Sequence, residues 1–253
     1  AGAVMRHPVF AANWKMNQAP ADAKAFMKQF IATYPRQQDR QVLFFPPALS
    51  ISVVVDATKD RPDIAVGVQN IHWEDAGAFT GENSAPMARA AGARFVLVGH
   101  SERRHVFGET EEETGRKVAT AVRAGLTAMI CVGETLAERE SGSTESVVKR
   151  QLSAVIHTLA HCAGEMVVAY EPVWAIGTGK TATPEQAQEV HAVLRAQLRA
   201  ATPRADAMTL LYGGSVKPDN AASLFAQSDI DGALVGGAAL KAADFVAICR
   251  AAG

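Results

Sequence analysis

Short apolar runs alternate with helix-like segments eight times along the chain of 253 residues. The apolar runs have the β-branched enrichment and flanking turn signals of buried strands, which are expected at residues 9–12, 42–45, 64–68, 95–98, 128–132, 166–170, 209–212 and 232–235. Between them, helices are expected at residues 21–33, 49–59, 85–91, 111–124, 145–161, 184–201, 219–227 and 239–252. This order predicts parallel strands joined by right-handed crossovers. Eight units without a linker favour an α/β fold that closes into one (β/α)8 TIM barrel with an outer ring of helices, and an open doubly wound sheet is the alternative.

The barrel is expected to form a single catalytic domain over residues 5–252. Residues 1–4 precede Met5, and we expect them to be an expression remnant outside the fold. A content of 48% hydrophobic and 20% charged residues suits one sizeable core. The formal net charge of -1 gives no support for binding nucleic acid or a membrane, and no apolar run approaches the roughly 18 residues that span a bilayer. The N-terminus lacks a signal-peptide hydrophobic region, so the protein is expected in the cytoplasm.

The three cysteines, Cys131, Cys162 and Cys249, are far apart and odd in number. Their spacing fits neither a disulfide framework nor a zinc motif, and a reducing compartment suits them best. Cys131 ends the fifth expected strand, where burial is the ordinary reason for a free cysteine.

A carboxylate followed by a glycine-containing loop ends the sixth expected strand. In a barrel of this type, reactive residues come from the C-terminal ends of strands, and Glu171 occupies such an end. Pro172 stops the strand, while Gly177 and Gly179 allow unusual torsions and leave backbone N–H groups free to approach an anion. Glu171 is therefore predicted to be a general base beneath a lid that excludes water. The lid comprises Pro172, Val173, Trp174, Ala175, Ile176, Gly177, Thr178, Gly179, Lys180, Thr181, Ala182 and Thr183. Behind it, Thr183 is expected to cap the next helix, with Gln186 completing a capping box.

Two glycine pairs follow the seventh and eighth strands, Gly213-Gly214 and Gly236-Gly237. Their backbone N–H groups can point at one spot, and barrels frequently bind phosphate with these two loops. No dinucleotide-binding or P-loop glycine motif occurs, so the sequence disfavours a nucleotide cofactor.

Two further strand ends carry a histidine and a lysine. His100 follows the fourth strand and opens the polar segment Ser101-Glu102-Arg103-Arg104. If this segment is helical, its N-terminus disfavours imidazolium and leaves a neutral ring able to act as an electrophile. Lys15 supplies a fixed positive charge beside Asn13. The other strand ends provide no second histidine and no aspartate cluster, so no metal site is expected.

Five motifs give the chain, over residues 5–252, a resemblance to the triosephosphate isomerase family. The motifs are Ala12-Asn13-Trp14-Lys15-Met16-Asn17, Gly77-Ala78-Phe79-Thr80-Gly81-Glu82, Gly99-His100-Ser101-Glu102-Arg103-Arg104, Tyr170-Glu171-Pro172-Val173-Trp174-Ala175-Ile176-Gly177-Thr178-Gly179 and Tyr212-Gly213-Gly214-Ser215. The resemblance implies interconversion of dihydroxyacetone phosphate and D-glyceraldehyde 3-phosphate in glycolysis and gluconeogenesis, through an enediol(ate) and without metal or organic cofactor.

By this resemblance, Glu171 moves the proton between the two carbons, and His100 polarises the carbonyl and moves protons between the two oxygens. Lys15, beside Asn13, stabilises negative charge on the intermediate and the phosphate, with Glu102 as a supporting carboxylate. The implied phosphate ligands are the backbone N–H groups of Gly177, Ser215, Gly236 and Gly237.

The loop at residues 69–82 resembles the family's projecting arm, which implies a homodimer with Thr80, Gly81 and Glu82 at the interface. Thr80 is expected to approach Asn13, Lys15 and His100 of the other copy. The sequence departs from the commoner family pattern at Asn83 and in the order Ser84-Ala85-Pro86-Met87, which affects the hinge of this loop.

Three other functions use similar parts. An epimerase-like barrel shares the phosphate site but needs metal-binding histidine and aspartate at strand ends. A class I aldolase would form a Schiff base on Lys15. A barrel that binds a phosphorylated ligand without turnover is the non-catalytic alternative.

Overall fold

Eight parallel strands close into a barrel in the computed structural model, which describes residues 6–161 and 166–252. Neighbours in sequence pair around the barrel, and β1 pairs with β8, so the open-sheet alternative is wrong and the barrel prediction is confirmed. The strands are β1 (Val9–Asn13), β2 (Gln41–Phe45), β3 (Ile64–Val68), β4 (Phe95–Val98), β5 (Thr127–Val132), β6 (Val167–Tyr170), β7 (Thr209–Tyr212) and β8 (Gly232–Val235). Residues 1–4 and Cys162 lie outside the described ranges.

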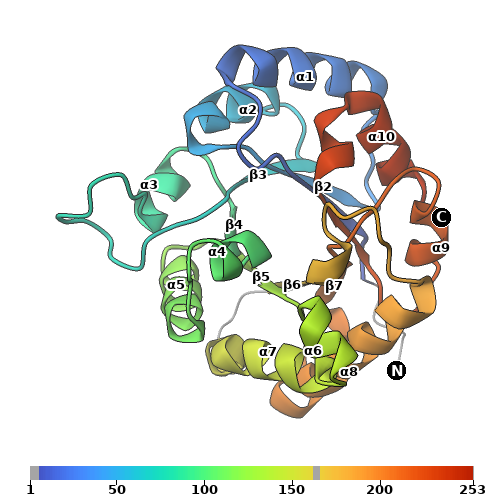
Figure 1. Ribbon diagram of the computed structural model, residues 1–253. Coiled ribbons are helices and arrows are strands. Elements are labelled where there is room, and N and C mark those ends of the chain that lie inside the picture. The colour runs from blue at the N-terminus through green and yellow to red at the C-terminus, as the bar shows by residue number, and fades with distance from the viewer. Residues whose placement is uncertain (1–5, 162–165, 253) are drawn as a thin grey trace.

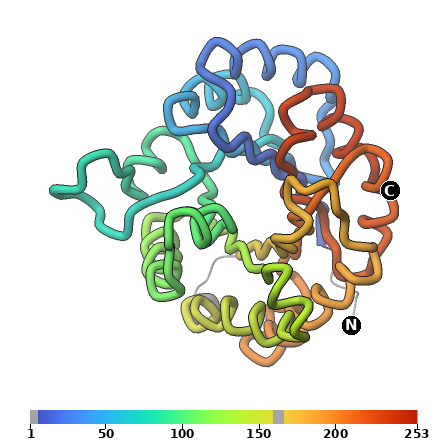
Figure 2. Tube along the Cα trace, viewed as in Figure 1, coloured from blue at the N-terminus to red at the C-terminus, as the bar shows by residue number. Residues whose placement is uncertain are grey.

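The helices form a ring around the strands (Figures 1 and 2). The α-helices are α1 (Pro20–Thr33), α2 (Ile51–Ala57), α3 (Ala85–Ala90), α4 (Ser101–His105), α5 (Glu111–Arg123), α6 (Leu136–Glu140), α7 (Thr144–His161), α8 (Pro184–Ala201), α9 (Ala221–Phe225) and α10 (Ala242–Arg250). Short 3-10 turns are η1 (Ala48–Ser50), η2 (Val173–Ala175), η3 (Ala205–Ala207) and η4 (Gly237–Leu240). Across residues 6–161 and 166–252, no helix combines the length and hydropathy that crossing a membrane requires.

Alternation along the strands divides the core into two layers. On β1, Val9 and Ala11 belong to a cluster inside the barrel, whereas Phe10 and Ala12 belong to the larger cluster between barrel and helices. This alternation follows from the two-residue period of a strand. Inside the barrel, the ring of Phe45 fills the space beside Gly67, where a Cβ atom would lie 2.3 Å from a ring carbon.

Closure of the barrel depends on a glycine opposite the first residue of β1. Gly232 pairs with Val9 and has a φ of +139°. A Cβ atom there would lie 1.8 Å from the carbonyl oxygen of Val9. Only glycine allows the two strands to approach so closely.

The structure differs from the expected helices in several places. Helix α4 forms over the polar segment after His100, which was considered helical only conditionally. Helix α6 forms after β5, where no helix was expected, and Thr135 and Glu138 form a capping box at its start. The expected helix at 239–252 is divided into η4 and α10. The expected helix at 219–227 shortens to α9. The division between η4 and α10 falls at Lys241, whose φ of -115° and ψ of 120° are extended rather than helical, so one continuous helix cannot pass through it.

Candidate active site

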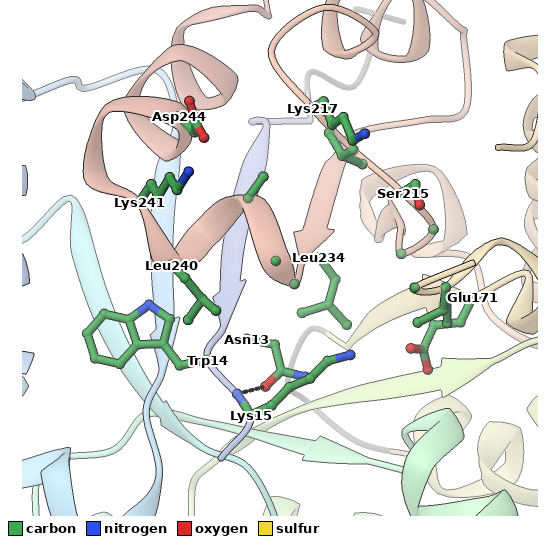
Figure 3. Close-up of a pocket in the computed structure, with 18 of the residues that line it drawn as sticks. Asn13, Trp14, Lys15, Glu171, Ser215, Lys217, Leu234, Leu240, Lys241 and Asp244 are labelled. Atoms are coloured by element: carbon green, nitrogen blue, oxygen red, sulfur yellow. Dashed lines mark hydrogen bonds between the residues drawn. The ribbon is translucent and has the colours of Figure 1, made fainter. Parts of the chain in front are cut away.

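The strand ends bring most of the candidate residues around one cavity of about 880 Å³. Asn13 ends β1, His100 follows β4, and Glu171 follows β6. The cavity is also lined by Lys15, Gly177, Ser215, Gly236 and Gly237. In Figure 3 the side chain of Lys15 extends toward the side of the cavity on which Glu171 is drawn. Glu102 instead lines a neighbouring cavity of about 370 Å³, which also contacts Asn13, Lys15 and His100.

Glu171 is held where three strands come together. Its backbone N–H donates to the carbonyl oxygen of Val132 on β5 at 2.7 Å, and Gly213 N–H donates to Tyr170 O at 2.7 Å. Beside it, a Cβ atom on Gly133 would lie 1.5 Å from the carbonyl oxygen of Glu171. The glycine after β5 therefore makes room for the backbone that carries the carboxylate.

His100 caps helix α4 with its own side chain. The Nδ1 atom of the ring accepts a hydrogen bond from Glu102 N–H at 3.1 Å. Because Nδ1 accepts, the proton of a neutral ring must lie on Nε2. That Nε2 atom is 2.9 Å from Oε2 of Glu171. The capping contact thus fixes both the tautomer and the direction of the ring.

The Glu171 carboxylate is almost completely buried, with 2% of the residue exposed. Its Oε1 atom accepts from Ser101 N–H at 3.0 Å, and Ser101 Oγ lies 3.4 Å from Oε2. Burial raises the pKa of Glu171, but the charge of His100 and the hydrogen bonds from His100 and Ser101 outweigh it, and the pKa is lowered. In this arrangement the carboxylate is ionised and fully paired.

The pKa of His100 moves the opposite way from the expectation based on the helix N-terminus alone. Burial lowers this pKa, whereas the charge of Glu171 and the hydrogen bond with it raise it by more, and the net direction is upward. The difference arises because the structure adds a buried carboxylate on the Nε2 side, while α4 acts on the Nδ1 side. Removing the contact with Glu171 would leave burial and the helix N-terminus, both of which favour the neutral ring.

Lys15 has a backbone conformation that non-glycine residues rarely adopt, with φ at 54°. Asn13 Oδ1 accepts a hydrogen bond from Lys15 N–H at 3.0 Å (Figure 3, dashed line). Gln69 donates from Nε2 to the carbonyl oxygens of Lys15 at 2.8 Å and Phe45 at 2.9 Å. These contacts direct the side chain to Glu102, whose Oε2 atom is 3.0 Å from Lys15 Nζ.

Part of the cavity wall is glycine backbone. Gly236 precedes the turn η4, and a Cβ atom there would lie 3.7 Å from Lys15 Nζ, so the backbone of Gly236 and the ammonium group are neighbours. Gly214 lies against Tyr212, whose hydroxyl would be 2.2 Å from an added Cβ atom. Nearby, Ser215 lines the cavity (Figure 3).

The segment 172–183 is fastened at its ends and exposed at its tip. Val173 N–H donates to the carbonyl oxygen of Glu134 at 3.0 Å, and Ser215 Oγ donates to Ala175 O at 2.8 Å. Residues 177–181 are exposed, with Gly177 and Gly179 at φ of 68° and 77°. At the far end, Thr183 and Gln186 form the predicted capping box, which is confirmed. This pattern allows the tip to move between two fixed ends.

The arm at 69–82 projects from the ring of helices between β3 and α3 (Figures 1 and 2). Thr80, Gly81 and Glu82 are exposed, and none of them lines the cavity of their own copy. The base of the arm is held by Gln69, described above, and by Asn70, whose Oδ1 atom accepts from Lys117 Nζ at 2.8 Å.

Two contacts at the site were not assigned a role from the sequence. Ser101 and Gln69 were recognised only as residues after strands, yet Ser101 binds the carboxylate of Glu171 and Gln69 holds the backbone of Lys15. Gln69 directly follows β3 and Ser101 lies three residues after the end of β4, which was the available signal. Within the part of the chain that the structure describes, no group of three or more His, Cys, Asp or Glu side chains could hold a metal ion, and Cys131 and Cys249 are free and buried.

Comparison with known proteins gives one consistent family. The family model described as triosephosphate isomerase matches residues 8–252. The triosephosphate isomerase of Delftia acidovorans is 53% identical over 248 residues, covering 98% of this chain and 100% of the relative. That of Paracidovorax citrulli is 54% identical over 246 residues, covering 96% and 98%. That of Pseudomonas putida is 51% identical over 252 residues, covering 98% and 100%.

Proposed function

The chain belongs to the triosephosphate isomerase family, and on that premise we propose that it interconverts dihydroxyacetone phosphate and D-glyceraldehyde 3-phosphate through an enediolate. One observation carries the chemistry: His100 Nε2 lies 2.9 Å from Glu171 Oε2, beside a cavity whose lining includes Gly213, Gly214, Gly236 and Gly237. The reaction serves glycolysis and gluconeogenesis, and we assign the protein to the cytoplasm, where these pathways run.

Glu171 is proposed to remove the proton from the carbon next to the carbonyl and to return it to the neighbouring carbon. In the present arrangement both oxygens are occupied by Ser101 and His100, so the carboxylate must leave them to reach a substrate. Pro172 begins the lid directly after Glu171, and lid closure can therefore move the base. Once its hydrogen bonds are given up, burial makes the carboxylate a stronger base.

His100 is proposed to polarise the substrate carbonyl and to move protons between the two oxygens. Its Nε2–H is free to turn from Glu171 to a substrate oxygen when the carboxylate leaves. The Nδ1 contact with Glu102 N–H keeps the ring in the tautomer that can donate from Nε2.

Lys15 is proposed to stabilise negative charge on the enediolate and on the phosphate. Its position supports both tasks, because the ammonium group neighbours the backbone of Gly236 and Lys15 lines the same cavity as Glu171 and His100. Asn13 holds the backbone of Lys15, and Glu102 supports its ammonium group. A fixed charge stabilises a developing oxyanion without reorganisation.

The phosphate is proposed to bind backbone N–H groups at Gly177, Ser215, Gly236 and Gly237, all of which line the cavity. Closure of the lid would bring Gly177 to the phosphate and exclude water. Water exclusion suppresses loss of phosphate from the intermediate. Base, electrophile and cation come from side chains, so we propose that neither a metal nor an organic cofactor takes part.

Proton NMR in deuterated water tests this proposal. Chelator-treated protein is incubated with dihydroxyacetone phosphate beside a Glu171→Gln variant. We expect aldose formation with deuterium at the exchanged carbon, largely abolished in the variant. Substrate binding without product or exchange in the wild type would favour the non-catalytic barrel instead.

We further propose that the protein is a homodimer joined through the arm at 69–82. Exposed apolar side chains surround the smaller cavity, with Met16 94%, Val106 71% and Phe107 67% exposed. Such a patch is costly in water and is typical of an interface. A second copy's arm, with Thr80 in this cavity, would cover the patch and contact the residues that hold Lys15 and His100.

Sedimentation and activity measurements test the dimer. Thr80→Arg is expected to shift the protein to monomers and to lower kcat, because a large cationic side chain would be forced into a cavity that is already lined by Lys15 and Arg103. Ala222→Arg, on the exposed side of α9, is the matched control. A variant with a shortened arm that is fully active as a monomer would contradict the proposal.

A further inference from the structure

The backbone of Gly99, one residue before His100, is held from both sides by charged side chains. Gly99 N–H donates to Oε2 of Glu109 at 2.9 Å. Arg104 donates from Nε to the carbonyl oxygen of Gly99 at 2.7 Å and from Nη2 to the carbonyl oxygen of Cys131 at 2.9 Å. Arg104 therefore also ties the end of β4 to β5. We refer to Glu109 and Arg104 together as the Gly99 clamp.

The clamp acts where the barrel no longer constrains the chain. The paired register of β4 with β5 ends at Val98 and Ile130, and Gly99 is the next residue. Gly99 has a φ of +71°, and a Cβ atom there would lie 2.7 Å from a guanidinium nitrogen of Arg104. The position thus needs glycine both for its torsion and for the contact with the clamp.

Burying the charged groups of the clamp costs desolvation free energy. Glu109 has 6% of its surface exposed. Its Oε1 atom contacts Nζ of the equally buried Lys117, which also binds Asn70, and lies 3.6 Å from Nε of Arg103. A buried ion pair adds little net stability compared with apolar residues of the same volume. Charged groups in this place are therefore better explained by the geometry that they impose than by the stability that they add.

We propose that Glu109 and Arg104 are positioning residues for His100: by holding both backbone groups of Gly99, they fix the direction in which the imidazole leaves β4. The His100 ring must satisfy contacts on both sides, with Glu102 N–H on Nδ1 and Glu171 on Nε2. Neither member of the clamp lines the cavity that holds Glu171, so each acts through the backbone. A displacement of about 1 Å in a reacting group can cost about 100-fold in rate. The inference rests on the proposed role of His100 as electrophile.

Three variants separate the parts of the clamp. Glu109→Leu removes the acceptor for Gly99 N–H, whereas Glu109→Gln keeps an oxygen acceptor. Arg104→Lys keeps the charge but loses the planar guanidinium fork, whose Nε and Nη2 atoms reach the two carbonyl oxygens from separate positions. The control is Ile248→Val on α10, a buried position on the other side of the barrel from α4 (Figure 1). It reports what a loss of core packing alone does to activity.

We expect Glu109→Leu to lower kcat about 100-fold while KM changes far less, and Arg104→Lys to lower kcat about 10-fold. Glu109→Gln should recover most of the loss. A misplaced His100 leaves proton removal by Glu171 possible but slows transfer between the oxygens. In deuterated water, we therefore compare the amount of deuterium exchanged into the recovered substrate with the amount of product formed. This ratio should rise in Glu109→Leu and stay constant in Ile248→Val.

NMR of 15N-labelled histidine reads the ring directly and needs no turnover. We expect the His100 signals to show an accepting Nδ1 and a protonated Nε2 in the wild type, and to change in Glu109→Leu and Arg104→Lys. Unchanged His100 signals with unchanged kcat would overturn the inference. A loss of kcat no larger than that of a core control such as Ile248→Val, at the same Tm, would also overturn it. If Glu109→Leu does not fold, Arg104→Lys decides alone. An inactive wild type would refute the proposed function, whereas the NMR comparison would still test the clamp.

Discussion

Nε2 of His100 lies 2.9 Å from Oε2 of Glu171, and each group changes the proton affinity of the other. The contact stabilises the ionised carboxylate and the protonated imidazole, so the pKa of Glu171 is lowered and that of His100 is raised. A base with a low pKa stays ionised over a wide pH range but attracts protons weakly. If Glu171 is the base, as we propose, the substrate-free pair is a resting arrangement, and proton removal requires the contact to break.

Replacing His100 should move the acid limb of kcat/KM to higher pH. In the wild type, Glu171 stays ionised to below its ordinary pKa of 4.5, because the effects of His100 and Ser101 exceed that of burial. His100→Gln removes the charge, while burial continues to raise the pKa of the carboxyl group. Profiles of kcat/KM from about pH 4 to about pH 9 measure the limb. His105→Gln, an exposed position on α4, is the control and should leave it in place. An unmoved limb in His100→Gln would show that the two groups are not coupled.

Lys15→Met should lower kcat/KM far more than removal of the carboxylate that pairs with Lys15. We expect kcat/KM to fall by about 100- to 1,000-fold, since a preorganised group that stabilises an oxyanion contributes on this scale. Glu102→Gln should cost less than about 10-fold, because the side chain of Glu102 is 44% exposed and its ion pair is weak in water. Steady-state kinetics at two salt concentrations measures both. Equal losses in the two variants would mean that Lys15 acts mainly through Glu102.

The site residues at the strand ends could be predicted from the sequence, because alternating strands and helices place the C-terminal ends of all the strands on one face of the barrel. Asn13, His100 and Glu171 each follow an apolar run, and closure of the barrel brings them together whatever the details of the helices. The contacts between them could not be predicted. Ser101 reaches Glu171 because α4 begins three residues after the end of β4, and the sequence indicated neither that start nor the contact. The pKa of His100 depends on a carboxylate 71 residues away in the chain, and sequence spacing carries no information on that distance.

Gly133→Ala should remove activity by displacing Glu171. The new Cβ atom would lie 1.5 Å from the carbonyl oxygen of Glu171, so the backbone after β6 must shift. We expect a loss of about 100-fold or more in kcat and about 3 kcal/mol in the free energy of unfolding. Gly142→Ala is the control. Its φ is also positive at +76°, but no atom lies within 4 Å of the added Cβ, so it should cost about 1–2 kcal/mol in stability and leave kcat unchanged. Equal kcat in both variants would contradict this account.

His191 on α8 is a fully buried histidine outside the cavity. Its Nδ1 atom lies 2.8 Å from the carbonyl oxygen of Asp229, and its ring meets the Tyr170 ring edge to face at 5.9 Å. Burial lowers the pKa of His191 to about 4, against the carbonyl contact and the charges of Asp231 and Asp229, which raise it, while Arg195 also lowers it. The folded protein therefore favours the neutral ring, with Nδ1–H donating to Asp229.

This lowered pKa predicts acid lability with a defined pH window. The unfolded chain, with an ordinary pKa of 6.5, binds a proton between about pH 6.5 and pH 4 that the folded protein excludes. The contribution of neutral His191 to the free energy of unfolding is complete above pH 6.5 and is lost as the pH falls to about 4. The difference of 2.5 pKa units corresponds to about 3 kcal/mol of unfolding free energy. Denaturant titrations at a fixed protein concentration measure this slope. His191→Gln should flatten it, whereas His7→Gln, at an exposed position, should keep it. The same slope in His191→Gln as in the wild type would assign the lability to other groups.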